Sequence, residues 1–239
     1  MLSELSGVPL GTIQKIFNEE TKSPRYETLQ ALENVLKPDT ELGFVREPAA
    51  EYHLNRSTSN LDDYYTLPQE QRMELIDGNF YAMSAPTLIH QTICLELSYY
   101  IRAHIRRKNG NCLIFTAPVD VQLDQDDYTM VQPDIAIVCD KSKLTNRCIM
   151  GAPDFIVEIT SPSTRERDIF LKLMKYQKAG VREYWIVDTE KKRIISYFFA
   201  EDDIPVIYGF DAAVPVKIYK EELIIDFSKI QQALPVFPE

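Results

Sequence analysis

Two short apolar segments, VQPDIAIV at 131–138 and PDFIVEIT at 153–160, decide the fold of this chain. Each has the length and composition of a buried strand, and each places a carboxylate beside or within its apolar run, Asp134 or Glu158; a further carboxylate, Asp154, precedes the second run. Because side chains alternate along a strand, Glu158 occupies the centre of an otherwise apolar strand, where an aliphatic residue is expected. A buried carboxylate is costly unless it is paired or binds a metal. The two segments therefore predict a site for a hard cation.

A helix is expected to follow the second segment, over residues 164–179. Ser163 and Glu166 have the spacing of a capping box at its start, and Gly180 is a typical C-terminal stop. This helix therefore comes directly after the strand that carries Glu158.

Three polar side chains, Asp168, Lys172 and Tyr176, share one face of this helix because they are four residues apart. Two arrangements fit them. Asp168 and Lys172 can form a surface ion pair, or Lys172 can point at Glu158 while Asp168 positions it. Asp134 also has two interpretations, because a residue after proline is common in turns but also marks a strand end, where active-site groups project.

The remaining pattern indicates a mixed α/β (α+β) fold, in which helices flank a mixed sheet. Asp77-Gly78 is a turn signal between two short strands, and the segment 87–108 has the apolar periodicity of a long helix. The expected strands are 74–76, 80–83, 112–123, 131–139, 153–160, 184–187 and 194–199.

Composition restricts the classes of function. The chain has 239 residues, of which 45% are hydrophobic, and a formal net charge of −10. This charge argues against a protein that coats nucleic acid, but not against a nuclease, which needs only a local basic rim. No apolar run reaches membrane-spanning length, so we expect a soluble cytoplasmic protein with no membrane partner. We expect reduced, buried thiols rather than disulfides or zinc ligands at Cys94, Cys112, Cys139 and Cys148.

The first 40 residues contain three apolar stripes of helical spacing, which is typical of a helix-turn-helix. They resemble the repressor/Cro-type family from its second helix onward, so the motif is truncated. The segment holds four basic and six acidic side chains, which weakens phosphate attraction and leaves a packing or oligomerisation role as the alternative. We expect this all-α segment at 1–40, a linker at 41–63 and the main domain at 64–239.

From Tyr64 to about Pro235 the chain resembles the putative restriction endonuclease family, once a domain of unknown function, in the PD-(D/E)XK nuclease superfamily. The resemblance implies a restriction-endonuclease-like fold with a central mixed sheet flanked by helices. The matching segments are MELIDGNFYAMS at 73–84, His90-Gln91, VQPDIAIV at 131–138, GAPDFIVEITSPST at 151–164, DIFLKLMKYQKAGVREYWIVD at 168–188 and LIIDF at 223–227.

This resemblance also implies roles for individual residues. Asp134 and Glu158 match the two acidic motif positions and would bind Mg²⁺ or Mn²⁺. The lysine that usually follows the glutamate by two residues is replaced by Thr160, and the resemblance moves that role to Lys172.

Two further positions match the family with less specific roles. Glu74 matches an acidic position near the metal. His90 matches a histidine at the start of the long helix, where a cap or core role is as compatible with the pattern as a catalytic one.

These observations predict a metal-dependent endonuclease that hydrolyses DNA, with a homodimer as a further possible state. The alternative is a catalytically silent nuclease fold that regulates by binding DNA or protein. A third possibility is a shortened mobile-element relic whose native start lies upstream.

Overall fold

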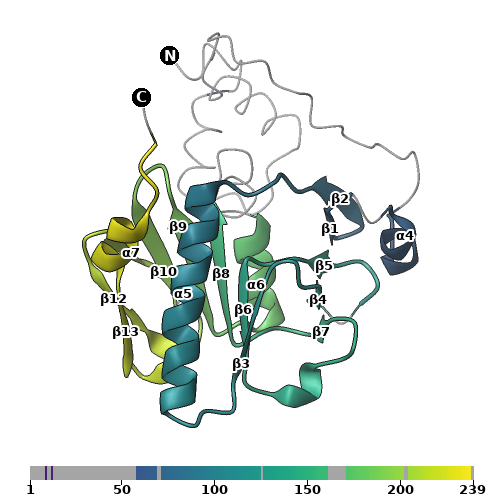
Figure 1. The fold of residues 1–239 in the computed structure, drawn as a ribbon. Coiled ribbons are helices and arrows are strands. Elements are labelled where there is room, and N and C mark those ends of the chain that lie inside the picture. Colours follow the sequence, from purple (N-terminus) through teal and green to yellow (C-terminus); the bar gives the residue numbers. More distant parts are fainter. Residues whose placement is uncertain are drawn as a thin grey trace. The chain divides into compact units, whose positions relative to one another are not determined.

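The computed structural model describes residues 58–68, 71–124, 126–160, 171–201 and 204–237, together with Pro9 and Thr12 (Figure 1). The chain divides into two units, Met1–Pro48 and Ala49–Glu239, and the fold below is that of the second. The predicted helix-turn-helix and the predicted capping box of Ser163 and Glu166 lie outside the described residues.

The largest element is a mixed sheet of six strands. Only β8 and β9 run parallel within it, and the other neighbouring strands are antiparallel. The order across the sheet is β11 (Val206–Gly209), β10 (Arg193–Tyr197), β9 (Glu183–Asp188), β8 (Phe155–Thr160), β6 (Ile135–Val138) and β3 (Leu113–Thr116).

Two smaller sheets and a set of helices complete the described part of the fold. The five-stranded sheet has the order β2 (Asn79–Ala82), β1 (Met73–Ile76), β5 (Met130–Val131), β4 (Val121–Gln122) and β7 (Ile149–Met150). A hairpin is formed by β12 (Ala213–Val216) and β13 (Leu223–Asp226). The helices are α4 (Leu61–Thr66), α5 (Leu88–Arg107), α6 (Leu173–Ala179), α7 (Phe227–Ala233) and the short 3₁₀ helices η1 (Lys141–Lys143) and η3 (Lys217–Tyr219).

The central strands β6, β8 and β9 are buried on both faces, as the apolar pattern of β8 predicts. Phe155, Val157 and Ile159 of β8 pack in one apolar cluster with residues of α5, β12, β13 and α7. Ile156 faces a second cluster, which contains Tyr176 of α6. In Figure 1, α5 runs along the length of the sheet, and it contacts β3, β8, β13 and α7.

The predicted hairpin and the predicted long helix are confirmed. Asp77 and Gly78 connect β1 to β2 with positive φ angles of 48° and 76°, which is the backbone that an Asp-Gly turn favours. Thr87 caps α5, because its side-chain oxygen accepts a hydrogen bond from the backbone N–H of His90.

Two predicted strands are each divided between the two larger sheets. The segment 112–123 forms β3 and β4, with Pro118 between them, and 131–139 forms β5 and β6, with Pro133 between them. Proline has no backbone N–H to donate, so a ladder ends at each position. The predicted single central sheet is therefore two mixed sheets joined by these segments.

The prediction of four reduced thiols is wrong for two of them. Cys112 and Cys139 form a disulfide with an S–S distance of 2.03 Å, and both side chains are half-buried. The antiparallel pairing of Leu113 with Val138 places the flanking cysteines opposite each other, which the chain order alone does not reveal. Cys94 and Cys148 are free and buried, as predicted.

Glu183 is a buried carboxylate outside the predicted site. It accepts hydrogen bonds from the indole N–H of Trp185 at 2.8 Å and from the backbone N–H groups of Lys217 and Ile218 at 3.1 and 2.8 Å. Burial, the main cause, raises its pKa from 4.5 to about 7, although these three donors act in the opposite direction. Glu183 thereby connects β9 to the first residues of η3.

We expect the protein to lose stability with rising pH because of Glu183. The folded state resists ionising this carboxyl, so the free energy of unfolding falls as pH rises from about 4.5 through about 7. The loss is at most about 3 kcal/mol. Denaturant unfolding at several pH values measures it, and Glu183→Gln, which does not titrate, should give a flatter profile. Parallel profiles for the two proteins would contradict the assignment.

Candidate active site

The two predicted metal-binding carboxylates lie in adjacent parts of the six-stranded sheet, Glu158 within β8 and Asp134 directly before β6. Ile135 of β6 pairs with Val157 of β8 in antiparallel register, so Asp134 and Glu158 lie directly opposite each other at the next position. Both side chains line one cavity. Glu158 is buried and Asp134 nearly so. The fold therefore brings together two carboxylates that are distant in the sequence.

Lys172 lies immediately before α6 and contacts two buried carboxylates at once. Its Nζ is 2.9 Å from Oε1 of Glu158 and 2.8 Å from Oε1 of Glu74. All three side chains are almost completely buried. Of the two arrangements that the sequence left open, the structure places Lys172 against Glu158. Asp168, which would position the lysine in that arrangement, lies outside the described residues.

Tyr176 reinforces the same cluster from one turn further along α6. Its hydroxyl donates a hydrogen bond to Oε1 of Glu158 at 2.6 Å. Burial, followed by the nearby charges of Glu158 and Glu74, raises the pKa of Tyr176 well above its usual value. The raised pKa favours the neutral phenol, which can donate this hydrogen bond and hold Glu158 in one orientation.

A second polar group surrounds Asp134. Its Oδ2 lies 3.0 Å from Nε2 of His90 and accepts a hydrogen bond from the backbone N–H of Ile159 at 2.8 Å. Within the described residues, no protein group donates to Oδ1 of Asp134. His90 comes from the first turn of α5, whose cap by Thr87 fixes its position. His90 therefore orients one oxygen of Asp134 and leaves the other available.

These groups line one cavity of about 150 Å³. Asp134, Glu158 and Lys172 line its walls. Glu74 does not line the cavity but contacts Lys172 from behind the wall. Cys94 also lines the cavity. Burial and, secondarily, Asp134 raise the pKa of its thiol to about 11, so Cys94 is protonated near neutral pH and is a poor nucleophile.

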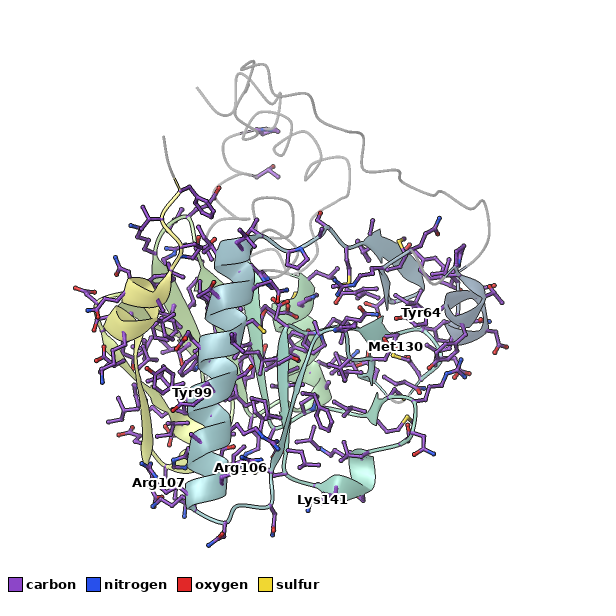
Figure 2. All side chains as sticks on the ribbon, viewed as in Figure 1. Tyr64, Tyr99, Arg106, Arg107, Met130 and Lys141 are labelled. Atoms are coloured by element: carbon purple, nitrogen blue, oxygen red, sulfur yellow. A yellow bond between two sulfur atoms is a disulfide. The ribbon has the colours of Figure 1, made fainter. Side chains whose placement is uncertain are left out.

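Sequence reasoning missed the polar network behind the cavity. Gln132 donates its backbone N–H to Glu74 at 2.9 Å and its side-chain amide to Tyr64 at 2.9 Å and Asp120 at 3.0 Å. Its Oε1 accepts from Arg72 at 3.4 Å. Figure 2 labels Tyr64, which lies at the side of the molecule that carries α4 and the five-stranded sheet.

One sequence signal was available for this network. Arg72 and Glu74 are two residues apart at the start of β1, as are Gln132 and Asp134 on either side of Pro133, and period-two spacing places side chains on one side of an extended chain. No local pattern indicates that Tyr64 and Asp120 meet, because they are far apart in the sequence.

The donor set suits a hard divalent cation. Asp134 and Glu158 offer carboxylate oxygens at one level of the sheet, and the carboxylates of the cluster outnumber its lysine, so a cation would offset excess negative charge. No group of three or more potential metal-ligating side chains is found among the described residues. Mg²⁺ fits this arrangement, since it is commonly held by one or two carboxylates and completes its shell with water and substrate phosphate.

A family model for Uma2, described as "Putative restriction endonuclease", matches residues 61–205. The chain belongs to this family. The match includes Glu74, His90, Asp134, Glu158 and Lys172, so the whole candidate site lies within it. The predicted helix-turn-helix lies before the matched region, and DNA binding by that segment stays a prediction.

The chain is similar in sequence to a known protein and in fold to a solved structure. An uncharacterized protein of Synechocystis is 26% identical over 147 residues, which cover 61% of this chain and 75% of that protein. The crystal structure of a putative nuclease belonging to DUF820, from Anabaena variabilis, is similar with a TM-score of 0.61 and 22% identity. That similarity covers 74% of this chain and 99% of the other, and it shows a shared fold.

The structure thus brings all five predicted site residues of this Uma2 protein together in two contacting sets, Lys172 with Glu74 and Glu158, and His90 with Asp134. Their catalytic roles stay predictions. Among the helices of the described ranges, none has the length and apolar character of a membrane span.

Proposed function

We propose that this protein is a metal-dependent endonuclease that hydrolyses phosphodiester bonds of DNA. The observation that carries the proposal is the opposed pair Asp134 and Glu158, with Lys172 held against Glu158 in the same cavity. Membership of a putative restriction endonuclease family supports DNA as the substrate.

The contacts of each side chain indicate its proposed role in hydrolysis. Asp134 and Glu158 would hold Mg²⁺ or Mn²⁺, which supplies a Lewis acid for the scissile phosphate and lowers the pKa of bound water. Lys172 contacts Glu158 and would add positive charge where negative charge develops during hydrolysis. His90 fixes Asp134, and Tyr176 fixes Glu158, so neither carboxylate must reorganise when substrate binds.

We expect the protein to nick or linearise supercoiled plasmid DNA with Mg²⁺ or Mn²⁺, and to leave it intact with a chelator. Ca²⁺, which resembles Mg²⁺ in its oxygen ligands but differs in geometry, should support binding without cutting. Gel electrophoresis of the plasmid measures cleavage, and a mobility shift in Ca²⁺ measures binding. Cleavage that persists in excess chelator would reject the metal-dependent mechanism.

A mobility shift without cutting in any metal would instead favour the silent DNA-binding protein. One feature of the site favours this second candidate, since Oε1 of Glu158 already accepts hydrogen bonds from both Lys172 and Tyr176. Absence of both binding and cutting would reject both DNA functions.

A further inference from the structure

Arg72 is a basic residue of the cavity to which the proposed mechanism gives no role. It lies directly before β1, is half-buried and lines the same cavity as Asp134, Glu158 and Lys172. A guanidinium group has five N–H donors in a planar fork and is always charged. Its surroundings therefore decide whether this charge is structural or awaits a ligand.

The described residues satisfy little of that donor capacity. Within the described residues, the one side-chain hydrogen bond of Arg72 runs from Nη2 to Oε1 of Gln132, and its length of 3.4 Å makes it weak. The Nε–H is buried and has no hydrogen-bond partner among the described residues. No carboxylate of this part of the chain forms an ion pair with Arg72, although three acidic side chains surround the cavity and its rear wall. Buried donors without a partner are uncommon in native proteins and call for an explanation.

The contacts of Gln132, the hydrogen-bond partner of Arg72, explain how Arg72 is held. The side chain of Gln132 is fixed by Tyr64 and Asp120, and its backbone N–H is fixed by Glu74. Arg72 thus donates a weak hydrogen bond to a neutral amide that is itself held in place, and no carboxylate of the described residues neutralises its charge. This arrangement preserves its positive charge for an anion in the cavity, and a planar fork suits the oxygens of a phosphate group.

We propose that Arg72 binds the non-bridging oxygens of a substrate phosphate in this cavity. The proposal rests on the proposed function, which it deepens by naming the residue that holds the phosphate beside the carboxylate pair. Arg72 would reduce the repulsion between that phosphate and the carboxylates, and it would fix the phosphate for attack. Lys172 cannot take this part, because both Glu74 and Glu158 already hold its ammonium group.

Inorganic phosphate tests the site without any need for catalysis. A ligand that binds the native state raises the melting temperature in a saturable way, so phosphate is titrated into the protein at constant Mg²⁺, with chloride at matched ionic strength. We expect Arg72→Gln to weaken phosphate binding by about tenfold or more, because charge-assisted hydrogen bonds are lost. Arg72→Lys, which keeps the charge but not the fork, should fall between the two proteins.

Arg106→Gln is the matched control. Figure 2 shows Arg106 at the C-terminal end of α5, whereas the N-terminal end of that helix lines the cavity. This variant removes the same charge and should respond to phosphate as the unaltered protein does. Circular dichroism confirms that each variant is folded.

Equal phosphate responses in the unaltered protein, Arg72→Gln and Arg72→Lys would overturn the assignment, whatever the protein does to DNA. Phosphate binding that depends on Arg72 in a protein that cuts no DNA would leave the phosphate site standing and reject the nuclease. If the protein cuts plasmid DNA, Arg72→Gln should also raise the KM for plasmid. A KM for Arg72→Lys close to that of the unaltered protein would show that the positive charge contributes to binding.

Discussion

Replacement of Lys172 by methionine should lower the free energy of unfolding by about 3–5 kcal/mol, the usual result of removing one partner from a buried ion pair. The ammonium group contacts Glu74 and Glu158 at 2.8 and 2.9 Å, and all three side chains are almost fully buried. Methionine fills a similar volume but leaves two carboxylates close together in a medium of low dielectric. Denaturant-induced unfolding, followed by circular dichroism, measures the change.

A double variant separates charge from packing. Glu74→Gln in the Lys172→Met background removes one of the two uncompensated carboxylates, so it should restore part of the lost stability. The same Glu74→Gln change should destabilise the unaltered protein, because Lys172 then loses a charged partner. Opposite signs in the two backgrounds are the signature of direct coupling.

Lys229→Met is the control for a general effect of removing lysine. Lys229 is 64% exposed and lies 3.9 Å from Asp226, so its loss should change stability by less than about 1 kcal/mol. A Lys172→Met protein as stable as the Lys229→Met protein would show that the buried cluster contributes nothing to folding.

The second large effect concerns catalysis. Glu158→Gln should reduce the rate of metal-dependent plasmid cleavage by at least about 10³-fold, because the amide removes one of two charged metal ligands. The protein should still fold, since Lys172 keeps its contact with Glu74 and Tyr176 can still donate to the amide oxygen. Mg²⁺ should also lose its effect on the melting temperature, which reports cation binding independently of cutting.

Glu222→Gln is a suitable control because Glu222 is an exposed carboxylate that pairs with Lys108. Both variants carry the same chemical change and the same purification history, so a contaminating nuclease would act equally in both. Cleavage by Glu158→Gln within about tenfold of the Glu222→Gln rate would place the metal site elsewhere.

Local chemistry made much of the fold predictable. The Asp-Gly turn at 77–78, the long apolar periodicity of α5 and the αL residue Gly180 at the end of α6 are each specified by neighbouring residues. The alternation in β8 was also predictable, and the two apolar clusters confirm which side chains share a face. These features depend on backbone preferences and on a period of two or 3.6, which a sequence displays directly.

Strand partners were harder to predict, because pairing depends on residues far apart in the chain. The same residues 112–123 and 131–139 that looked like single strands serve two sheets, and the disulfide of Cys112 and Cys139 follows from that pairing. Pro118 and Pro133 were visible as ladder breakers, but a proline does not reveal which sheet each half joins.

The sequence by itself determined that Glu158 lies within a buried apolar strand, that Asp134 comes directly before another apolar segment, and which lysine follows them. Only the tertiary structure decided what satisfies each charge. Lys172 contacts both Glu74 and Glu158, His90 contacts Asp134, and Arg72 donates a hydrogen bond to Gln132. The physical reason is that burial is a local property of composition, whereas the geometry of a hydrogen bond is set by how β1, β6, β8, α5 and α6 pack around one cavity.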